Sequence, residues 1–231
     1  MSLVNQAMGG PKCDEYHCNV NKSFAKLEGF CLKNQESLKK KAIQTLESRG
    51  CHVFLVSNAE KAVDKIAEIA QSGRIVTCHD PQIEALGIHE KLQKRGVRVQ
   101  GTNVEGFERG EINHVWLKMR QEIAESAFGL TGVQAVVANH GSLMLMDERG
   151  SVHTVSALPY KHIAVAKVQQ IVPDLADAMI VARSASLGKT DRKLVRYISI
   201  VTGPSSTSDI EGKNVRGMHG PKEVYVILVE E

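Results

Sequence analysis

Two loops in the last third of the chain carry residue types suited to ligand binding and proton transfer. Residues 202–211 read Thr-Gly-Pro-Ser-Ser-Thr-Ser-Asp-Ile-Glu, and residues 217–221 read Gly-Met-His-Gly-Pro. Glycine amides and hydroxyl groups can surround an anion, and the imidazole of His219 can exchange a proton near neutral pH. These loops therefore predict a pocket for a small anionic ligand, with His219 as its proton-transfer or hydrogen-bonding group.

The first loop follows a short apolar run, residues 197–201, which predicts a buried strand. In open α/β sheets the ligand crevice lies outside the carboxyl ends of the strands, so we expect this loop to border such a crevice. The same residues have a local structural interpretation, because Ser208 and Glu211 have the Ser-x-x-Glu spacing of a helix capping box. The two interpretations are compatible, since a capped helix start also attracts anions.

Three further glycine-rich or polar segments, residues 129–132, 139–142 and 158–162, occur at expected strand ends. Parallel-sheet geometry favours their convergence with the two loops into one pocket. His219 and His162 are the expected catalytic side chains. The expected ligand-binding residues are Asn139, His140, Gly141, Ser142, Gly203, Pro204, Ser205, Thr207, Asp209, Gly217 and Gly220.

The sequence lacks the motifs of nucleotide-binding sites, serine nucleophiles and metal sites. The chain has neither the Gly-x-Gly-x-x-Gly nor the P-loop spacing of nucleotide sites, and no Gly-x-Ser-x-Gly elbow supports Ser205 or Ser206 as a nucleophile. Cys13, His17 and Cys18 are not followed by a second ligand pair, so no metal site is predicted.

The composition indicates which classes of partner and which cellular compartment to expect. The 231 residues include 29 basic and 26 acidic side chains, a net charge of +3, and only 4% aromatic residues, so nucleic-acid binding is not expected. Five cysteines with no preceding secretory segment favour a reducing, cytoplasmic setting. Residues 126–146 lack charge, but glycines and polar residues interrupt them, so no membrane span is predicted.

The pattern of apolar residues predicts an N-terminal arm at 1–33, partly disordered or with one short helix, and a single α/β domain at 34–231. Helices and strands alternate, which favours a mostly parallel sheet covered by helices. The expected helices start near residues 34, 58, 81, 112 and 173, and the expected strands cover 53–56, 74–77, 97–99, 133–138, 142–146, 162–165, 197–201 and 224–229.

The loops, taken in order, resemble those of the LUD-domain family, typified by lactate-utilisation protein C. The resemblance is strong over the C-terminal hundred or so residues and only general before them. It rests on residues 129–133, 141–143, 158–159, 162–164, 171–173, 202–205 with Thr207, 209–211 and 217–221.

This resemblance implies a fold like that of the NagB, ribose-phosphate isomerase and CoA-transferase group. It also implies a role in oxidising L-lactate, or a related hydroxy acid, to pyruvate beside iron–sulfur partner proteins. No cofactor is expected in this chain, and the iron–sulfur clusters are expected on the partners. The family usually has an acidic residue in place of Gln134, Glu-Thr in place of Asn139-His140, and arginine in place of Ser206.

Two other functions remain open from the sequence. One is an autonomous isomerase or transferase acting on a sugar phosphate or acyl-CoA, by analogy of fold. The other is a non-catalytic assembly or regulatory protein. The sequence leaves open whether the chain is an enzyme by itself.

Overall fold

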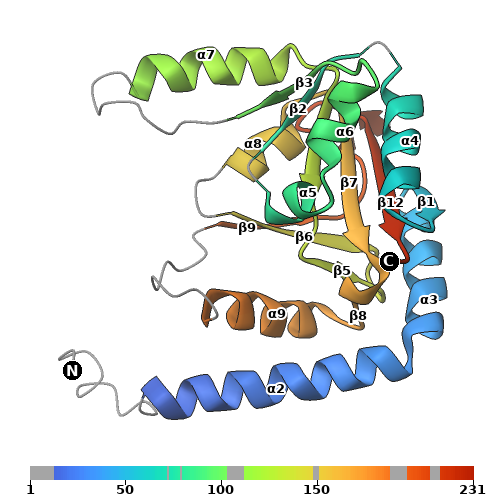
Figure 1. Cartoon of the computed structure of the whole chain (residues 1–231), viewed down its shortest axis with the longest axis vertical. Coiled ribbons are helices and arrows are strands. Elements are labelled where there is room, and N and C mark those ends of the chain that lie inside the picture. Colours follow the sequence, from blue (N-terminus) through green and yellow to red (C-terminus); the bar gives the residue numbers. More distant parts are fainter. Residues whose placement is uncertain are drawn as a thin grey trace.

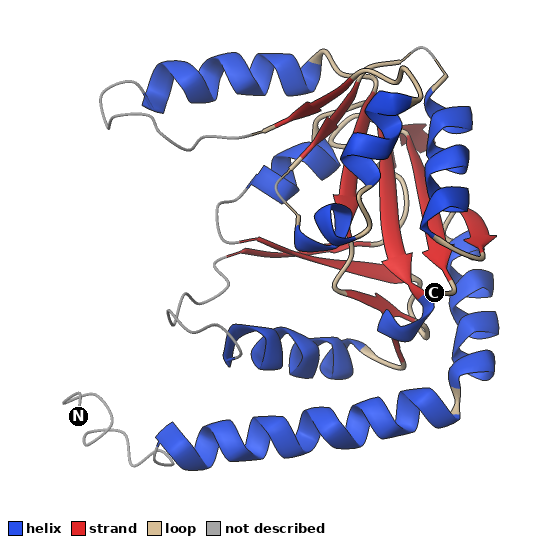
Figure 2. Cartoon of the chain, in the orientation of Figure 1, coloured by secondary structure: helices blue, strands red, loops and turns tan. Residues whose placement is uncertain are grey.

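The architecture comes from a computed structural model that describes residues 13–71, 73–78, 80–102, 112–147, 151–187, 197–208 and 214–231. Two β-sheets and the helices around them form successive layers (Figure 1). Figure 2 shows strands in the middle of the molecule and the longer helices along its outer sides.

The larger sheet has six strands, and every neighbouring pair in it is parallel. Parallel strands covered on both faces are typically continuous apolar runs, as in β7 and β12. In spatial order the strands are β1 (His52–Val56), β12 (Glu223–Val229), β7 (Lys161–Lys167), β4 (Phe128–Gly132), β2 (Ile75–Thr77) and β3 (Val99–Gly101). The predicted α/β class with a mostly parallel, helix-covered sheet is confirmed.

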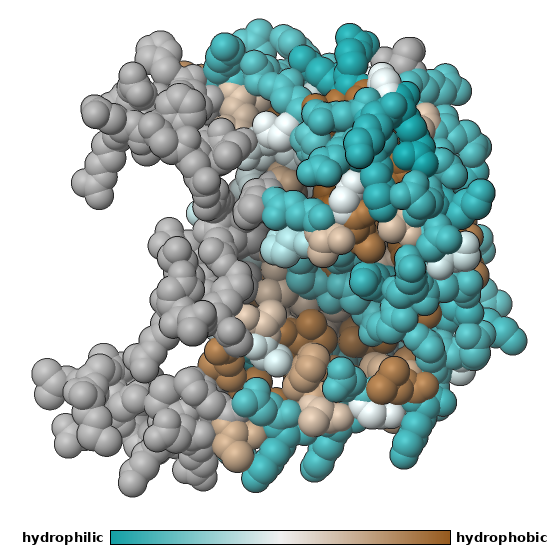
Figure 3. All heavy atoms as spheres, viewed as in Figure 1, coloured by the Kyte–Doolittle hydropathy of each residue, from teal (hydrophilic) through white to brown (hydrophobic). Residues whose placement is uncertain are grey.

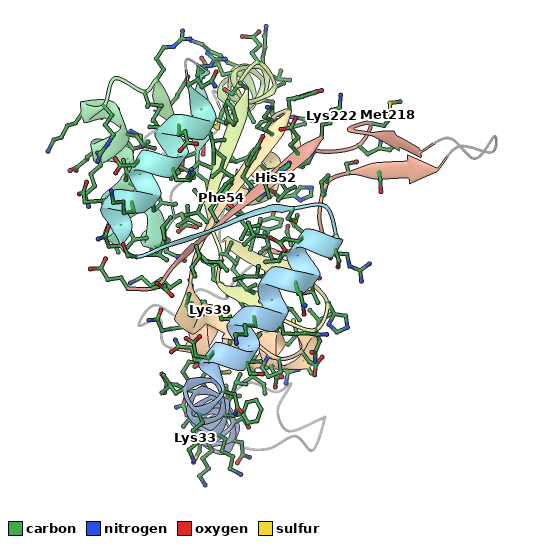
Figure 4. All side chains as sticks on the ribbon, turned by 90° about the vertical axis from the view of Figure 1, so that its right-hand side faces the viewer. Lys33, Lys39, His52, Phe54, Met218 and Lys222 are labelled. Carbon is green, nitrogen blue, oxygen red and sulfur yellow. The ribbon has the colours of Figure 1, made fainter. Side chains whose placement is uncertain are left out.

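A second sheet of four strands packs beside the first. Its spatial order is β8 (Ile171–Val172), β5 (Ala135–Val137), β6 (Ser142–Asp147) and β9 (Tyr197–Val201). The β5–β8 pair is parallel, and β6 is antiparallel to both β5 and β9. A separate hairpin of β10 (Ser206–Ser208) and β11 (Asn214–Arg216) projects from the body, with Met218 and Lys222 beside it (Figure 4).

One face of the six-stranded sheet is covered by α4 (Ala59–Ala70), α5 (Pro81–Ala85) and α6 (Ile88–Lys94). Ala62, Val63 and Ile66 recur at helical spacing on α4 and are fully buried against the sheet. The start of α4 is fixed by Asn58, whose side chain accepts a hydrogen bond from the Lys61 amide.

The opposite face packs on α3 (Gln35–Ser48), α7 (Ile112–Ala124), α8 (Ser151–Ala157) and the second sheet. The outer face of the second sheet is covered by α2 (Cys13–Lys33) and α9 (Leu175–Leu187), and the short helix η1 (Val168–Gln170) joins β7 to β8. The described residues therefore form four layers, with an apolar cluster between each neighbouring pair of layers.

Most predicted elements are present, but two strands that were predicted to be buried lie at the edges of their sheets. Residues 53–56 lie in β1, which is an edge strand, and Leu55 is 44% exposed. Figure 4 looks onto this edge, with His52 and Phe54 labelled near α3 and α4. Residues 197–201 form β9, an edge strand of the second sheet, where Ile200 is 42% exposed.

The predicted helix cap at Ser208 is also wrong, because Ser208 ends β10 and pairs with Asn214 in the hairpin. Glu211 lies outside the described residues. Several elements were not predicted, among them β4, α8, η1, β8 and the β10–β11 hairpin. Strand β4 contains Gly129 and Gly132, which indicated a loop, and α8 is only 7 residues long.

The N-terminal segment contains a longer helix than the sequence indicated, since α2 spans 21 residues. Its buried Val20 and Leu27 provide apolar surface for packing, and Leu27 shares a cluster with Ala178 and Ala182 of α9. The division of the chain at residue 33 stays a prediction. Within the described ranges, none of the helices combines the length and the apolar character needed to cross a bilayer.

Candidate functional site

An open groove of about 610 Å³ lies among α8, β9 and the two loops singled out from the sequence. Residues 202–206 and 219–221 line it on the loop side, and His153, Ser156 and Ala157 line it from α8. Of the predicted ligand-binding residues, Gly203, Pro204, Ser205 and Gly220 line this groove, together with His219.

Main-chain hydrogen bonds hold the two loops together. The Ser205 amide donates to the Pro221 carbonyl at 2.9 Å, and the Gly217 amide donates to the Ser205 carbonyl at 2.9 Å. The His219 amide donates to the Ser205 hydroxyl at 3.3 Å. Ser205 therefore sets the path of the loop that carries His219.

Gly203 is needed for the close approach of its loop to α3. Its φ is +79°, and a Cβ there would lie 2.5 Å from the Arg49 carbonyl oxygen. A side chain at this position would be strained and would also collide with the end of α3. Because Gly203 has no side chain, the first loop can pack closely against the end of α3 while it lines the groove.

The groove lies at the amino end of the parallel sheet, whereas the sequence predicted the carboxyl end. Lys161 and Glu223, the first residues of β7 and β12, are paired in register, and the 217–221 loop leads directly into that end. The prediction was wrong because β9, which the first loop follows, belongs to the second sheet.

Two imidazoles line the groove. The His219 side chain is exposed, and His153 on α8 places its Nδ1 atom 3.3 Å from the Ser199 hydroxyl on β9. His153 was not among the predicted site residues, because residues 151–157 have no pattern that indicated a helix. The only feature of the sequence that pointed to His153 was its position nine residues before His162, a predicted catalytic residue.

None of the described residues that line the groove is an aspartate, glutamate, lysine or arginine. Its polar groups are hydroxyls, main-chain groups and the imidazoles of His153 and His219. Such a lining can donate hydrogen bonds to a carboxylate and exchange a proton, and no lining carboxylate would repel an anion.

The predicted catalytic His162 is not among the residues that line the groove. It is fully buried on β7, with Nε2 2.8 Å from the Thr131 hydroxyl of β4. Nδ1 has no hydrogen-bond partner in the described part of the chain. Burial lowers the pKa of His162 to about 4, so the imidazole is neutral near pH 7.

The predicted 139–142 segment reaches the site only through its last residue. The Ser142 hydroxyl lies 2.8 Å from the Thr202 hydroxyl, next to the groove. By contrast, Asn139 donates a side-chain hydrogen bond to Asp174 at 2.9 Å, and His140 Nδ1 is 3.9 Å from the same carboxylate. Gly141, with φ +64°, packs against Thr45 of α3.

The remaining predicted residues lie at the margin. Gly217 has φ +86° and forms the turn before His219. Thr207 pairs with Val215 in the projecting hairpin, and Asp209 lies outside the described residues. Among the described side chains, no group of three or more His, Cys, Asp or Glu is arranged to hold a metal ion.

Comparison with known proteins identifies one family. A family model described as the LUD domain matches residues 39–229. Lactate utilization protein C of Halalkalibacterium halodurans is 29% identical over 178 residues, which cover 76% of this chain and 71% of the relative. The protein of the same name from Anoxybacillus flavithermus is 26% identical over 186 residues, covering 77% and 74%.

Two further similarities are more distant, one to a longer protein and one to a solved structure. Lactate utilization protein B of Bacillus subtilis is 22% identical over 230 residues, which cover 81% of this chain and 46% of the relative. A crystal structure of a DUF162 family protein from Deinococcus radiodurans superposes with a TM-score of 0.56 at 19% identity. The match covers 84% of this chain and 98% of that one, and it supports the fold.

Proposed function

The chain belongs to the LUD-domain family, and on that premise we propose that it acts in lactate utilisation by binding a small hydroxy acid in the groove. L-Lactate or a related acid is the proposed ligand. The protein would support oxidation of the acid to pyruvate as one subunit of a larger system, in the cytoplasm.

The observation that carries this proposal is the lining of the groove. It combines His219, His153 and several hydroxyls with no carboxylate among the described lining residues. A hydroxy acid needs donors for its carboxylate and a group that can accept a hydrogen bond or proton from its hydroxyl. The names of the two protein C relatives point to the same class of metabolite.

Oxidation of lactate to pyruvate releases two electrons and two protons. We propose that this chain binds and orients the acid, with His219 as the group that accepts the hydroxyl proton, while the proton from the C–H bond passes to water. Iron–sulfur clusters on partner proteins would accept the electrons. His162 is proposed as a support of the sheet beneath the site, because it is buried and does not line the groove.

Thermal unfolding with added ligands tests the proposal. L-Lactate and other 2-hydroxy acids should raise the unfolding temperature, since a ligand at a hundredfold excess over its Kd stabilises by about 2.7 kcal/mol. His219→Ala and His153→Ala should remove the shift. His89→Ala is the matched control, because His89 lies on α6 and contacts Gln93.

Other outcomes would favour the rival functions. A shift with sugar phosphates or CoA esters, and turnover of them by the chain alone, would indicate an autonomous isomerase or transferase. If no metabolite binds with or without iron–sulfur partners, and His219→Ala leaves lactate oxidation unchanged, a non-catalytic assembly role replaces the proposal. His140→Ala tests whether the 139–142 turn contributes to the site.

A further inference from the structure

A second pocket lies on the other side of the molecule's second sheet, under α2. It has a volume of about 230 Å³, and its walls come from α2, α3, η1, β8 and α9. Figure 3, in the orientation of Figure 1, shows hydrophobic side chains over α2 and α9 in the lower part of the molecule, beside hydrophilic ones. No residue that lines this pocket lines the groove.

The size of the pocket suits a ring compound. A dry apolar cavity of about 150 Å³ is sufficient to bind benzene, and this pocket exceeds that volume. Most of its wall is apolar, contributed by Phe24, Leu27, Leu38, Val172 and Val181. The pocket can therefore hold one or two fused rings without a change of fold.

Of the four glutamines that line the pocket, Gln134, Gln169 and Gln170 already have side-chain hydrogen bonds within the protein. Gln134 accepts a hydrogen bond from the Met146 amide at 2.9 Å, and Gln169 donates to the Glu230 carbonyl at 3.2 Å. Gln170 accepts from the Lys167 amide at 2.6 Å and donates to the Val133 carbonyl at 2.6 Å. A polar ligand that competed for these bonded atoms would break the bonds, whereas an apolar ligand leaves them intact.

Charge at the pocket also disfavours an anion. Glu28 is the charged residue among those lining the pocket, and it is exposed. Cys31, which also lines the pocket, has its pKa raised by burial and by the nearby charge of Asp177. Both carboxylates would repel an anionic ligand, in contrast to the lining of the groove.

We propose that this pocket is a separate binding site for an uncharged apolar ring compound, held between α2 and the second sheet. Because α2 supplies one wall and η1, β8 and α9 supply the other, the ligand contacts both only while α2 is docked. Binding therefore stabilises the docked position of α2 by mass action.

Naphthalene is the test ligand, and 2-naphthoate, the same ring system with a carboxylate, is its matched control. Naphthalene should raise the unfolding temperature of the full chain, and 2-naphthoate should not. Val181→Phe, which fills the pocket, should abolish the shift. Leu117→Phe, at a side chain 65% exposed on α7, should retain it.

A second measurement does not depend on the folding of a variant. Cys31 lines the pocket, whereas Cys18 on the same helix is exposed. Trypsin places Cys31 in the 27–33 peptide and Cys18 in the 13–22 peptide, and fragment ions of the latter distinguish Cys18 from Cys13. At ten times its Kd, naphthalene should slow alkylation of Cys31 by N-ethylmaleimide about tenfold and leave Cys18 unchanged.

The proposal is overturned if naphthalene neither shifts unfolding nor protects Cys31, or if 2-naphthoate acts equally well. Equal shifts for the native chain and a folded Val181→Phe variant would also overturn it. The lactate tests of the groove use other residues and ligands, so either proposal can fail while the other holds.

Discussion

Thr131 Oγ1 and His162 Nε2 lie 2.8 Å apart on two adjacent central strands, and both side chains are fully buried. Their face of the sheet is the one covered by α3, α7 and α8, since they alternate with Leu130 and Ile163, which pack on the α4 side. A neutral imidazole is thus part of the core.

The first prediction concerns stability against pH. Burial lowers the folded-state pKa of His162 to about 4, against an ordinary value of 6.5. Between these values the unfolded chain binds a proton that the folded chain does not, so the free energy of unfolding falls as pH decreases from 6.5 to 4. The full difference corresponds to about 3 kcal/mol, measurable by urea unfolding across this range.

The variant His162→Gln isolates this contribution, because it removes the titration while retaining a hydrogen-bonding side chain. As pH falls from 6.5 to 4, the free energy of unfolding should decrease less in His162→Gln than in the native chain. The difference between the two decreases is the contribution of His162. Burial raises the pKa of Asp80, which gives a slope of opposite sign, so the difference between the two profiles is the relevant quantity. Parallel profiles would contradict the prediction.

The second prediction compares two glycines. A Cβ at Gly129 would overlap the Val155 carbonyl oxygen of α8, so Gly129→Ala should destabilise the protein by several kcal/mol, on the order of 3 or more. Gly29 in α2 has open space around it, and Gly29→Ala should stabilise by up to about 1 kcal/mol. Chemical denaturation measures both. Equal effects would show that α8 does not pack on β4 as described.

The third prediction compares two residues that begin helices. Asp80 is buried, and its carboxylate accepts hydrogen bonds from the amides of Gln82, Ile83 and Gly132. Asp80→Ala would leave three donors without this acceptor and should cost about 3 kcal/mol.

The exposed cap at Asn58 supplies the comparison for Asp80. It accepts one hydrogen bond, from the Lys61 amide, so Asn58→Ala should cost about 1 kcal/mol. Urea unfolding of both variants at pH 7 measures the two costs. An Asp80→Ala variant no less stable than Asn58→Ala would show that the bond to Gly132 contributes little.

The fourth prediction separates binding from stability in the groove. In Ser205→Ala the two main-chain bonds of residue 205 remain, so stability should change by less than about 1 kcal/mol. The His219 loop loses its bond to the hydroxyl, so lactate affinity should fall. Isothermal titration and thermal unfolding measure the two quantities. Unchanged affinity in this variant would exclude Ser205 as a support for the site.

Elements with a strong local pattern were predictable from the sequence. The period of Ala62, Val63 and Ile66, with Asn58 before them, indicated α4 and its start, and the apolar run at 224–229 indicated β12. These signals are local, and the packed structure agrees with them.

Elements that depend on a partner far along the chain were not predictable. Gly129 and Gly132 suggested a loop, yet β4 is fully buried because their missing side chains leave space for Val155 and Asp80. Strand β9 has the composition of a core strand, but its pairing with β6 places it at a sheet edge. Pattern alone does not assign a strand to one of two sheets.

The candidate site was predictable in part for the same reason. The 202–205 and 217–221 loops meet through Ser205, as their residue types suggested. His153 lines the groove from α8, whereas Asn139 is hydrogen-bonded to Asp174 and does not line the groove. Both positions depend on the packing of segments that are distant in the sequence. The contribution of each residue to ligand binding stays a prediction.

The position of β12 within the larger sheet has a consequence for biosynthesis. This strand, Glu223–Val229, lies between β1 and β7, so it joins an edge strand made early to the centre of the sheet. The six-stranded sheet cannot close until these residues have left the ribosome. At about 5–20 residues per second, the nascent chain exposes unpaired strand edges for many seconds.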